Sequence, residues 1–229
     1  MKEYISEGAN IIEVEHNGRQ YKIVHYTKPE EVLNAVTHGV GALLFLIGLV
    51  WLLTLSKGNA MNITASFLLC TPAIVVYTVS TIYHSTIDVR KKYYWRKIDH
   101  SDIPFIVLGC SAPICLCIST NPYNFIALGL SFAFAAINIA LNIKSVDKFK
   151  VPSMIINFVV GVLLFGVYLD NRALIPIEVK YFYFVGTALC ILGSIIFAIK
   201  VRYVHCIFHI FELVGTMMFF GAAVILISA

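Results

Sequence analysis

Seven long apolar runs constrain the fold of this chain more than any other feature. They lie at about 38–56, 62–84, 101–119, 123–143, 153–170, 179–200 and 206–228. A helix of about 20 apolar residues crosses the ~30 Å hydrocarbon core of a bilayer. Because lipid offers no hydrogen bonds to the backbone, helices are the economical way to span it. The sequence therefore predicts an all-α polytopic membrane protein with seven transmembrane helices.

The composition excludes a soluble domain. Hydrophobic residues make up 59% of the chain and charged residues only 13%, whereas soluble domains are about 45–50% apolar and about 25% charged. The net charge of +4 does not indicate a nucleic-acid partner, because the basic residues lie in short connecting segments. The six cysteines lie in or beside apolar runs and form no CxxC pair, which is typical of small buried residues.

Residues 1–30 differ in kind from the transmembrane domain at 31–229. The stretch "IIEVEHNGRQYKIVHY" holds two β-branched runs on either side of Asn17-Gly18. An Asn-Gly pair between such runs is a strong β-hairpin signal. We expect a small hairpin on the aqueous side of the membrane, with His16 and His25 on its surface.

The basic residues also predict the orientation. All but three of the 17 Lys and Arg residues lie in the N-terminal segment and in the connections after the second, fourth and sixth runs; the exceptions are Lys57, Arg172 and Lys180. Cytoplasmic loops carry an excess of Lys and Arg. We expect a multi-pass protein of the cell membrane with a cytoplasmic N-terminus and an outside C-terminus.

Five of the seven histidines lie at the predicted cytoplasmic ends of the helices: His38, His84, His100, His205 and His209. Ionisable groups are costly inside a membrane and usually mark a functional site. Because they lie at the same depth, we expect one polar site at the cytoplasmic boundary of the membrane.

His205 and His209, in "HCIFHIFE", are four residues apart, so their rings lie on one helix face. That spacing suits a metal ion but is weak evidence alone. His84, in "STIYHS", brings a third imidazole to the same depth. Three neutral imidazoles and a water form the open tetrahedral site of catalytic zinc. Imidazole also suits other transition metals.

Ser80 and Asp99 are the predicted catalytic residues. Ser80 lies one turn from His84 on the same face, and Asp99 opens the third helix at the same membrane depth. A carboxylate beside a metal site can take a proton from water, and a hydroxyl can stabilise an oxyanion. The alternatives are a backbone-bonded helical serine and a helix N-cap aspartate.

Four motifs together resemble one known family: "EVLNAVTHGVGA" (31–42), "STIYH" (80–84), "IDHS" (98–101) and "HCIFH" (205–209). The chain is identified by them as similar to the bacterial hemolysin III-type members of the progestin and adipoQ receptor family, whose wider group includes alkaline ceramidases. The resemblance covers about residues 31–228. It implies seven transmembrane helices, a cytoplasmic-side zinc held by His84, His205 and His209, and assisting roles for Ser80 and Asp99.

Asp102 and Glu212 are acidic where the family pattern predicts small or apolar residues. They lie three residues after Asp99 and His209, so they extend the two faces of the site inward. One hypothesis is that they make the cavity more acidic, or that one of them serves as a proton relay or an extra ligand. The simpler interpretation is that they are protonated or hydrogen-bonded between helices.

Three functions remain open. The resemblance implies a zinc-dependent hydrolase of a lipid amide or ester, with a membrane lipid as substrate. The family's haemolytic label suggests a membrane-lytic or pore-forming protein with structural zinc, although no continuous polar stripe in the sequence indicates a pore. The third is a receptor-like protein that binds a lipid without turnover.

Overall fold

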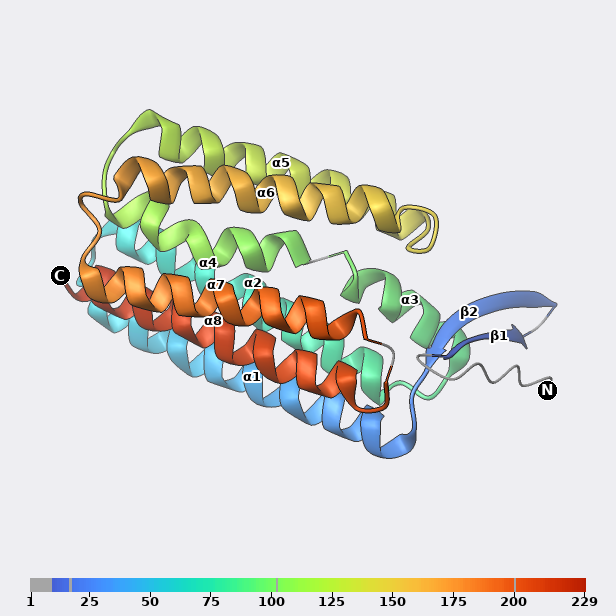
Figure 1. The fold of residues 1–229 in the computed structure, drawn as a ribbon. Coiled ribbons are helices and arrows are strands. Elements are labelled where there is room, and N and C mark those ends of the chain that lie inside the picture. The colour runs from blue at the N-terminus through green and yellow to red at the C-terminus, as the bar shows by residue number, and fades with distance from the viewer. Residues whose placement is uncertain (1–9, 17, 102, 200) are drawn as a thin grey trace.

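The computed structural model describes residues 10–16, 18–101, 103–199 and 201–229 (Figure 1). Its elements are β1 (Asn10–His16), β2 (Arg19–His25), α1 (Lys28–Leu55), α2 (Ala60–Ser85), α3 (Val89–Asp99), α4 (Ile103–Cys117), α5 (Pro122–Lys144), α6 (Lys150–Asn171), α7 (Ile177–Phe197) and α8 (Val204–Ser228). Seven spans are long and apolar enough to cross a membrane, and the third of them runs through α3 and α4. The predicted all-helical fold with seven spans is confirmed.

The predicted β-hairpin is also confirmed. β1 pairs antiparallel with β2, in a register that runs from Asn10 opposite His25 to His16 opposite Arg19. Gly18, in the connecting turn, has a φ of +73° that favours glycine. The hairpin packs on α3. We call the end of the bundle that carries it the hairpin end (Figure 1).

We expected the segment after α2 to be a loop, but it is helical. It forms a separate helix, α3, because Asp88 caps it by accepting a hydrogen bond from the Lys91 backbone N–H at 2.8 Å. Lys92 and Arg96, four residues apart, share its buried face. Asp99 is consequently the last residue of α3. The expectation that it opens the third helix was wrong, and the alternative that it is an N-cap does not hold either.

α4 is the central helix of the bundle. It packs against α2, α5, α6 and α8. In Figure 1, α5 and α6 lie together on one side of it, while α1, α7 and α8 lie on the other. Because most of its surface faces other helices, α4 contributes to the core on nearly every side, and its buried residues run almost without a break from Ile106 to Leu116.

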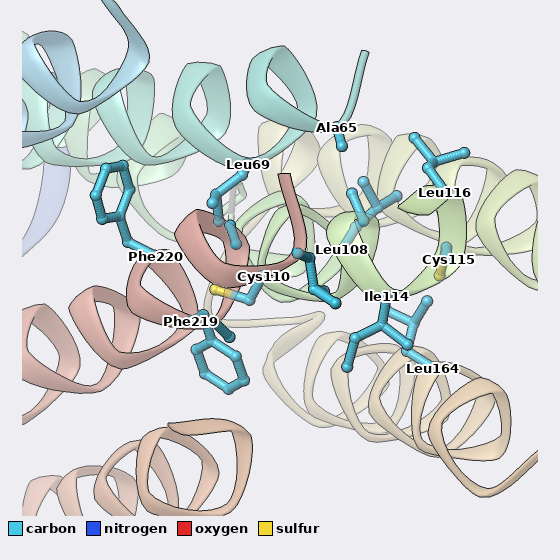
Figure 2. Close-up of a cluster of buried hydrophobic side chains, with 14 of the residues drawn as sticks. Ala65, Leu69, Leu108, Cys110, Ile114, Cys115, Leu116, Leu164, Phe219 and Phe220 are labelled. Atoms are coloured by element: carbon cyan, nitrogen blue, oxygen red, sulfur yellow. The ribbon is translucent and has the colours of Figure 1, made fainter. Parts of the chain in front are cut away.

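An apolar core fills the half of the bundle away from the hairpin end. Figure 2 shows buried side chains of α2, α4, α6 and α8 in this cluster, among them Leu69, Leu108, Leu164 and Phe219. Such packing excludes water from that half of the molecule. The predicted polar site, with His84, His205 and His209, therefore lies in the other half of the bundle, where α2 ends and α8 begins.

Candidate metal centre

The structure brings the three predicted ligands together at the hairpin end. His84 lies in the last turn of α2, and His205 and His209 lie in the first two turns of α8. One ligand nitrogen from each ring lies within 4.8 Å of the other two. His84 and His209 are 3% and 2% exposed. The end of α2 and the start of α8 thus bring the three imidazoles together inside the protein.

The spacing of the nitrogens fits a tetrahedral metal ion. His84 Nε2 and His205 Nε2 are 3.2 Å apart. Two nitrogens, each about 2.0–2.1 Å from a tetrahedral zinc ion, lie about 3.3 Å from each other. The donor set, three imidazoles, is also one that zinc accepts. The separation of this pair therefore suits a shared metal ion, and the third ligand nitrogen, from His209, lies within 4.8 Å of both.

Polar groups on α1 orient two of the three rings. The Nδ1 of His84 lies 2.7 Å from Glu31 Oε2, and the Nδ1 of His209 lies 3.4 Å from the Thr37 hydroxyl. Because a carboxylate only accepts hydrogen bonds, His84 donates its Nδ1–H and keeps the Nε2 lone pair for a ligand. Asn34 approaches the same Nδ1 only to 3.5 Å. A carboxylate behind a ligand histidine is a common supporting contact of zinc sites.

Tyr26 covers the third ring, His205. The two rings are stacked with centroids 4.9 Å apart and planes 22° apart, and the Tyr26 ring lies 5.6 Å from that of His84. Burial raises the pKa of the Tyr26 phenol, and the negative charges of Glu31 and Asp99 raise it further. Its hydroxyl therefore stays protonated at neutral pH beside the cluster.

The start of α8 is fixed by a contact with α1. Tyr203 has a left-handed φ of +64°, and its backbone N–H donates to Glu30 Oε1 at 2.9 Å. The other oxygen of Glu30 accepts from the Thr27 backbone N–H, also at 2.9 Å. Because His205 follows Tyr203 by two residues, this contact sets its place relative to His84.

The two predicted catalytic residues come from different helices, Ser80 from α2 and Asp99 from α3. Asp99, at the end of α3, interacts electrostatically with His84 and His205, and its side chain is 13% exposed. Ser80 is 1% exposed on α2. Within the described part of the chain its hydroxyl makes no hydrogen bond, whereas that of neighbouring Thr81 bonds the carbonyl of Tyr77 at 2.7 Å. The backbone-bonded alternative for Ser80 therefore does not hold.

The remaining predicted groups surround this cluster. The ring of His38 stacks on that of His209 with centroids 3.6 Å apart, and neither of its nitrogens has a hydrogen-bond partner in the described structure. The Nδ1 of His100 lies 3.3 Å from the carboxylate of Asp99. Glu212 is half-buried on α8 and is not one of the three groups that share the metal-binding point. Asp102 lies outside the described residues.

Sequence reasoning missed the supporting roles of Glu31, Thr37 and Tyr26. A signal for α1 was present, because Asn34, His38, Gly41 and Phe45 recur at helical spacing and are buried on one face. Asn34 and His38, the polar residues at the start of that face, were the signal that α1 contributes to the site. Tyr26 carries no such signal, because it lies between the hairpin and α1 and belongs to no periodic run.

Comparisons with known proteins agree with this architecture. The sequence model of a family described as "Haemolysin-III related" matches residues 26–220. A protein of Bacillus subtilis (strain 168) named "Hemolysin-3 homolog" is 28% identical over 209 residues, covering 85% of this chain and 93% of that protein. A protein of Bacillus cereus named "Hemolysin-3" is 26% identical over 203 residues, covering 83% and 89%.

Proposed function

We propose that this chain, which belongs to the haemolysin-III related family, is a zinc-dependent hydrolase that cleaves an amide or ester bond of a membrane lipid. The proposal rests on the cluster of three histidines formed by His84, His205 and His209. The Nε2 atoms of His84 and His205 are 3.2 Å apart, a separation that a shared zinc ion would give, and the cluster is built into an otherwise apolar membrane protein. Its position at the hairpin end would place it near the membrane boundary, where lipid headgroups meet water.

The three histidines would hold the ion, and zinc so held supplies a Lewis acid that polarises a carbonyl and makes water more acidic. Asp99 takes one proton from the attacking water, for which its partial exposure and its charge interaction with the cluster suit it. The Ser80 hydroxyl, free of a backbone bond, donates to the oxyanion that develops on the carbonyl. Water adds across the bond, so the products are a carboxylic acid and an amine or alcohol.

The hairpin end is the proposed cytoplasmic side of a cell membrane. The Lys and Arg residues of α3 and of the α5–α6 connection, together with Arg202 before α8, gather there, as the charge distribution of membrane proteins favours. A substrate lipid would then reach the site from the inner leaflet. Nothing in the charge distribution favours a nucleic-acid partner.

Membrane lysis is a second candidate, favoured by the names of the two relatives. In that case, as in a receptor that binds a lipid without turnover, the metal would be structural. The apolar core shown in Figure 2 argues against a water-filled path through the half of the bundle that it occupies. We therefore place the hydrolase first.

The test is turnover by purified zinc-loaded protein in detergent. Ceramides and related lipid amides and esters are incubated with wild type, with Asp99→Asn and with Lys57→Gln, a control at the opposite end of the bundle. We expect product from wild type and from the control, and at least a 100-fold lower rate from Asp99→Asn. Equal turnover by all three proteins, or none by wild type, would refute the hydrolase; haemolysis by wild type without lipid turnover would favour the second candidate.

A further inference from the structure

Lys92 is a buried lysine on a strongly basic helix, α3. It is 7% exposed, whereas its neighbours Arg90 and Lys91 are exposed. A lysine ammonium is costly to bury unless it is paired and hydrogen-bonded. Near a membrane boundary, a lysine would ordinarily extend its side chain to the water. The inward direction of Lys92 therefore needs a partner that compensates for the lost hydration.

That partner is Glu31, the residue that supports His84. Lys92 Nζ lies 2.7 Å from Glu31 Oε1, while Glu31 Oε2 lies 2.7 Å from His84 Nδ1. The two oxygens of one carboxylate thus contact an ammonium and an imidazole. Because both oxygens are held, the carboxylate has one orientation, and the plane of the imidazole follows from it.

Lys92 is itself fixed by the end of α2. Its ammonium donates to the carbonyls of Tyr83 and Thr86 at 3.2 and 3.3 Å and lies 4.8 Å above the Tyr83 ring. The carbonyls at a helix C-terminus form the negative end of the helix dipole and favour a cation. The same helix end carries His84, so Lys92 connects the ligand's own backbone to the carboxylate that orients its ring.

We propose that Lys92 is a positioning residue of the metal centre. By holding Glu31 in one orientation it fixes the Nδ1–H of His84 and directs the Nε2 of that ring toward the ion. The inference rests on the metal binding of the proposed function but not on hydrolysis. It makes α3, which contributes no metal ligand, a structural part of the site.

The test is the metal affinity of full-length protein in detergent, after chelation and reloading. Zinc affinity is measured by competition with a chromogenic chelator, and the site geometry by the visible spectrum of bound Co²⁺. We expect Lys92→Met and Glu31→Gln each to weaken zinc binding about 10–100-fold, as loss of such supporting contacts does. The double variant should lose little more than the worse single variant, because both changes break one chain of contacts.

Two further variants separate positioning from general stability. Lys91→Met removes an exposed charge from the same helix and should leave the affinity and the Co²⁺ spectrum unchanged. Lys92→Arg keeps a cation and should recover most of the affinity that Lys92→Met loses. Should Lys92→Met fail to fold, Glu31→Gln carries the same test.

Wild-type affinity and an unchanged Co²⁺ spectrum in folded Lys92→Met or in Glu31→Gln would overturn the inference, even if the protein hydrolyses lipids. Conversely, a wild type that binds zinc tightly but hydrolyses nothing would refute the enzyme and leave the role of Lys92 standing. A wild type that binds no zinc would overturn both.

Discussion

At the scale of single residues, the three histidines of the candidate metal centre are not held alike. His84 and His209 have polar partners on α1, whereas the Nδ1 of His205 is buried without a partner in the described structure. His205 is oriented by its stacking on Tyr26. Aromatic pairs of this kind contribute about 0.5–1.5 kcal/mol beyond burial. The ring of Tyr26 therefore matters more to the site than its hydroxyl.

Removing that ring should weaken metal binding. We predict that Tyr26→Ala lowers zinc affinity about 2–10-fold, the equivalent of the stacking energy, while Tyr26→Phe keeps the wild-type value. Chelator competition on the purified variants measures both. A loss in Tyr26→Phe equal to that in Tyr26→Ala would instead assign the effect to the hydroxyl.

Glu212 should not be a ligand. It lies one turn further along α8 than His209, outside the point where the three imidazoles meet. We predict that Glu212→Gln, which keeps the shape of the side chain, binds as much zinc per chain as wild type. Elemental analysis of the purified variant tests this, and a substantial loss of zinc would show that the carboxylate takes part in binding.

At the scale of elements, the position of α8 depends on close packing against α7. A Cβ added to Gly186 would lie 2.9 Å from the carbonyl oxygen of Gly215 and 3.1 Å from Met218 Cβ. Small residues of this kind let membrane helices approach each other. Because α8 carries two of the three predicted ligands, this contact also supports the candidate metal centre.

We predict that Gly186→Ala destabilises the protein by about 1–3 kcal/mol, the usual cost of overpacking. The matched control is Gly161→Ala on α6, where an added Cβ meets nothing within 4 Å; it should leave stability unchanged or slightly higher, because alanine is the better helix former. Unfolding in detergent micelles compares the two. Equal effects of both substitutions would argue against the close α7–α8 contact.

Much of this architecture was predictable at the level of elements. The seven spans followed from hydropathy and length, and the hairpin from Asn17-Gly18. The three-histidine site followed because His84 and the pair on α8 were placed at one membrane depth. α3 was missed because a short, strongly basic helix has the composition of a loop. The contacts of Glu31, Lys92 and Tyr26 depend on how distant elements pack, which no local pattern encodes.

At the scale of the whole molecule, a bound metal ion would join two helices that make few direct contacts. α2 and α8 touch only slightly, and each packs mainly on other helices. An ion that binds only the folded state stabilises it by mass action, by about 2.7 kcal/mol at 100 times its Kd. The metal would thus add to the stability of the bundle as a whole.

We therefore predict that chelation lowers the melting temperature of the purified protein and that zinc restores it in a concentration-dependent manner. The variant His84→Ala should show neither response, because it lacks a ligand of the site. Differential scanning fluorimetry in detergent is sufficient. A melting temperature that chelator and zinc leave unchanged would mean that the cluster binds no ion in the folded protein.

The metal content of the protein as purified tests the central claim most directly. Wild type and the variant His205→Ala/His209→Ala are purified without added metal, shown to be folded, and analysed by inductively coupled plasma mass spectrometry. We expect about one zinc ion per wild-type chain, the capacity of a single three-histidine site, and none in the variant. A folded wild type without a stoichiometric metal, or equal metal in both proteins, would contradict the central claim.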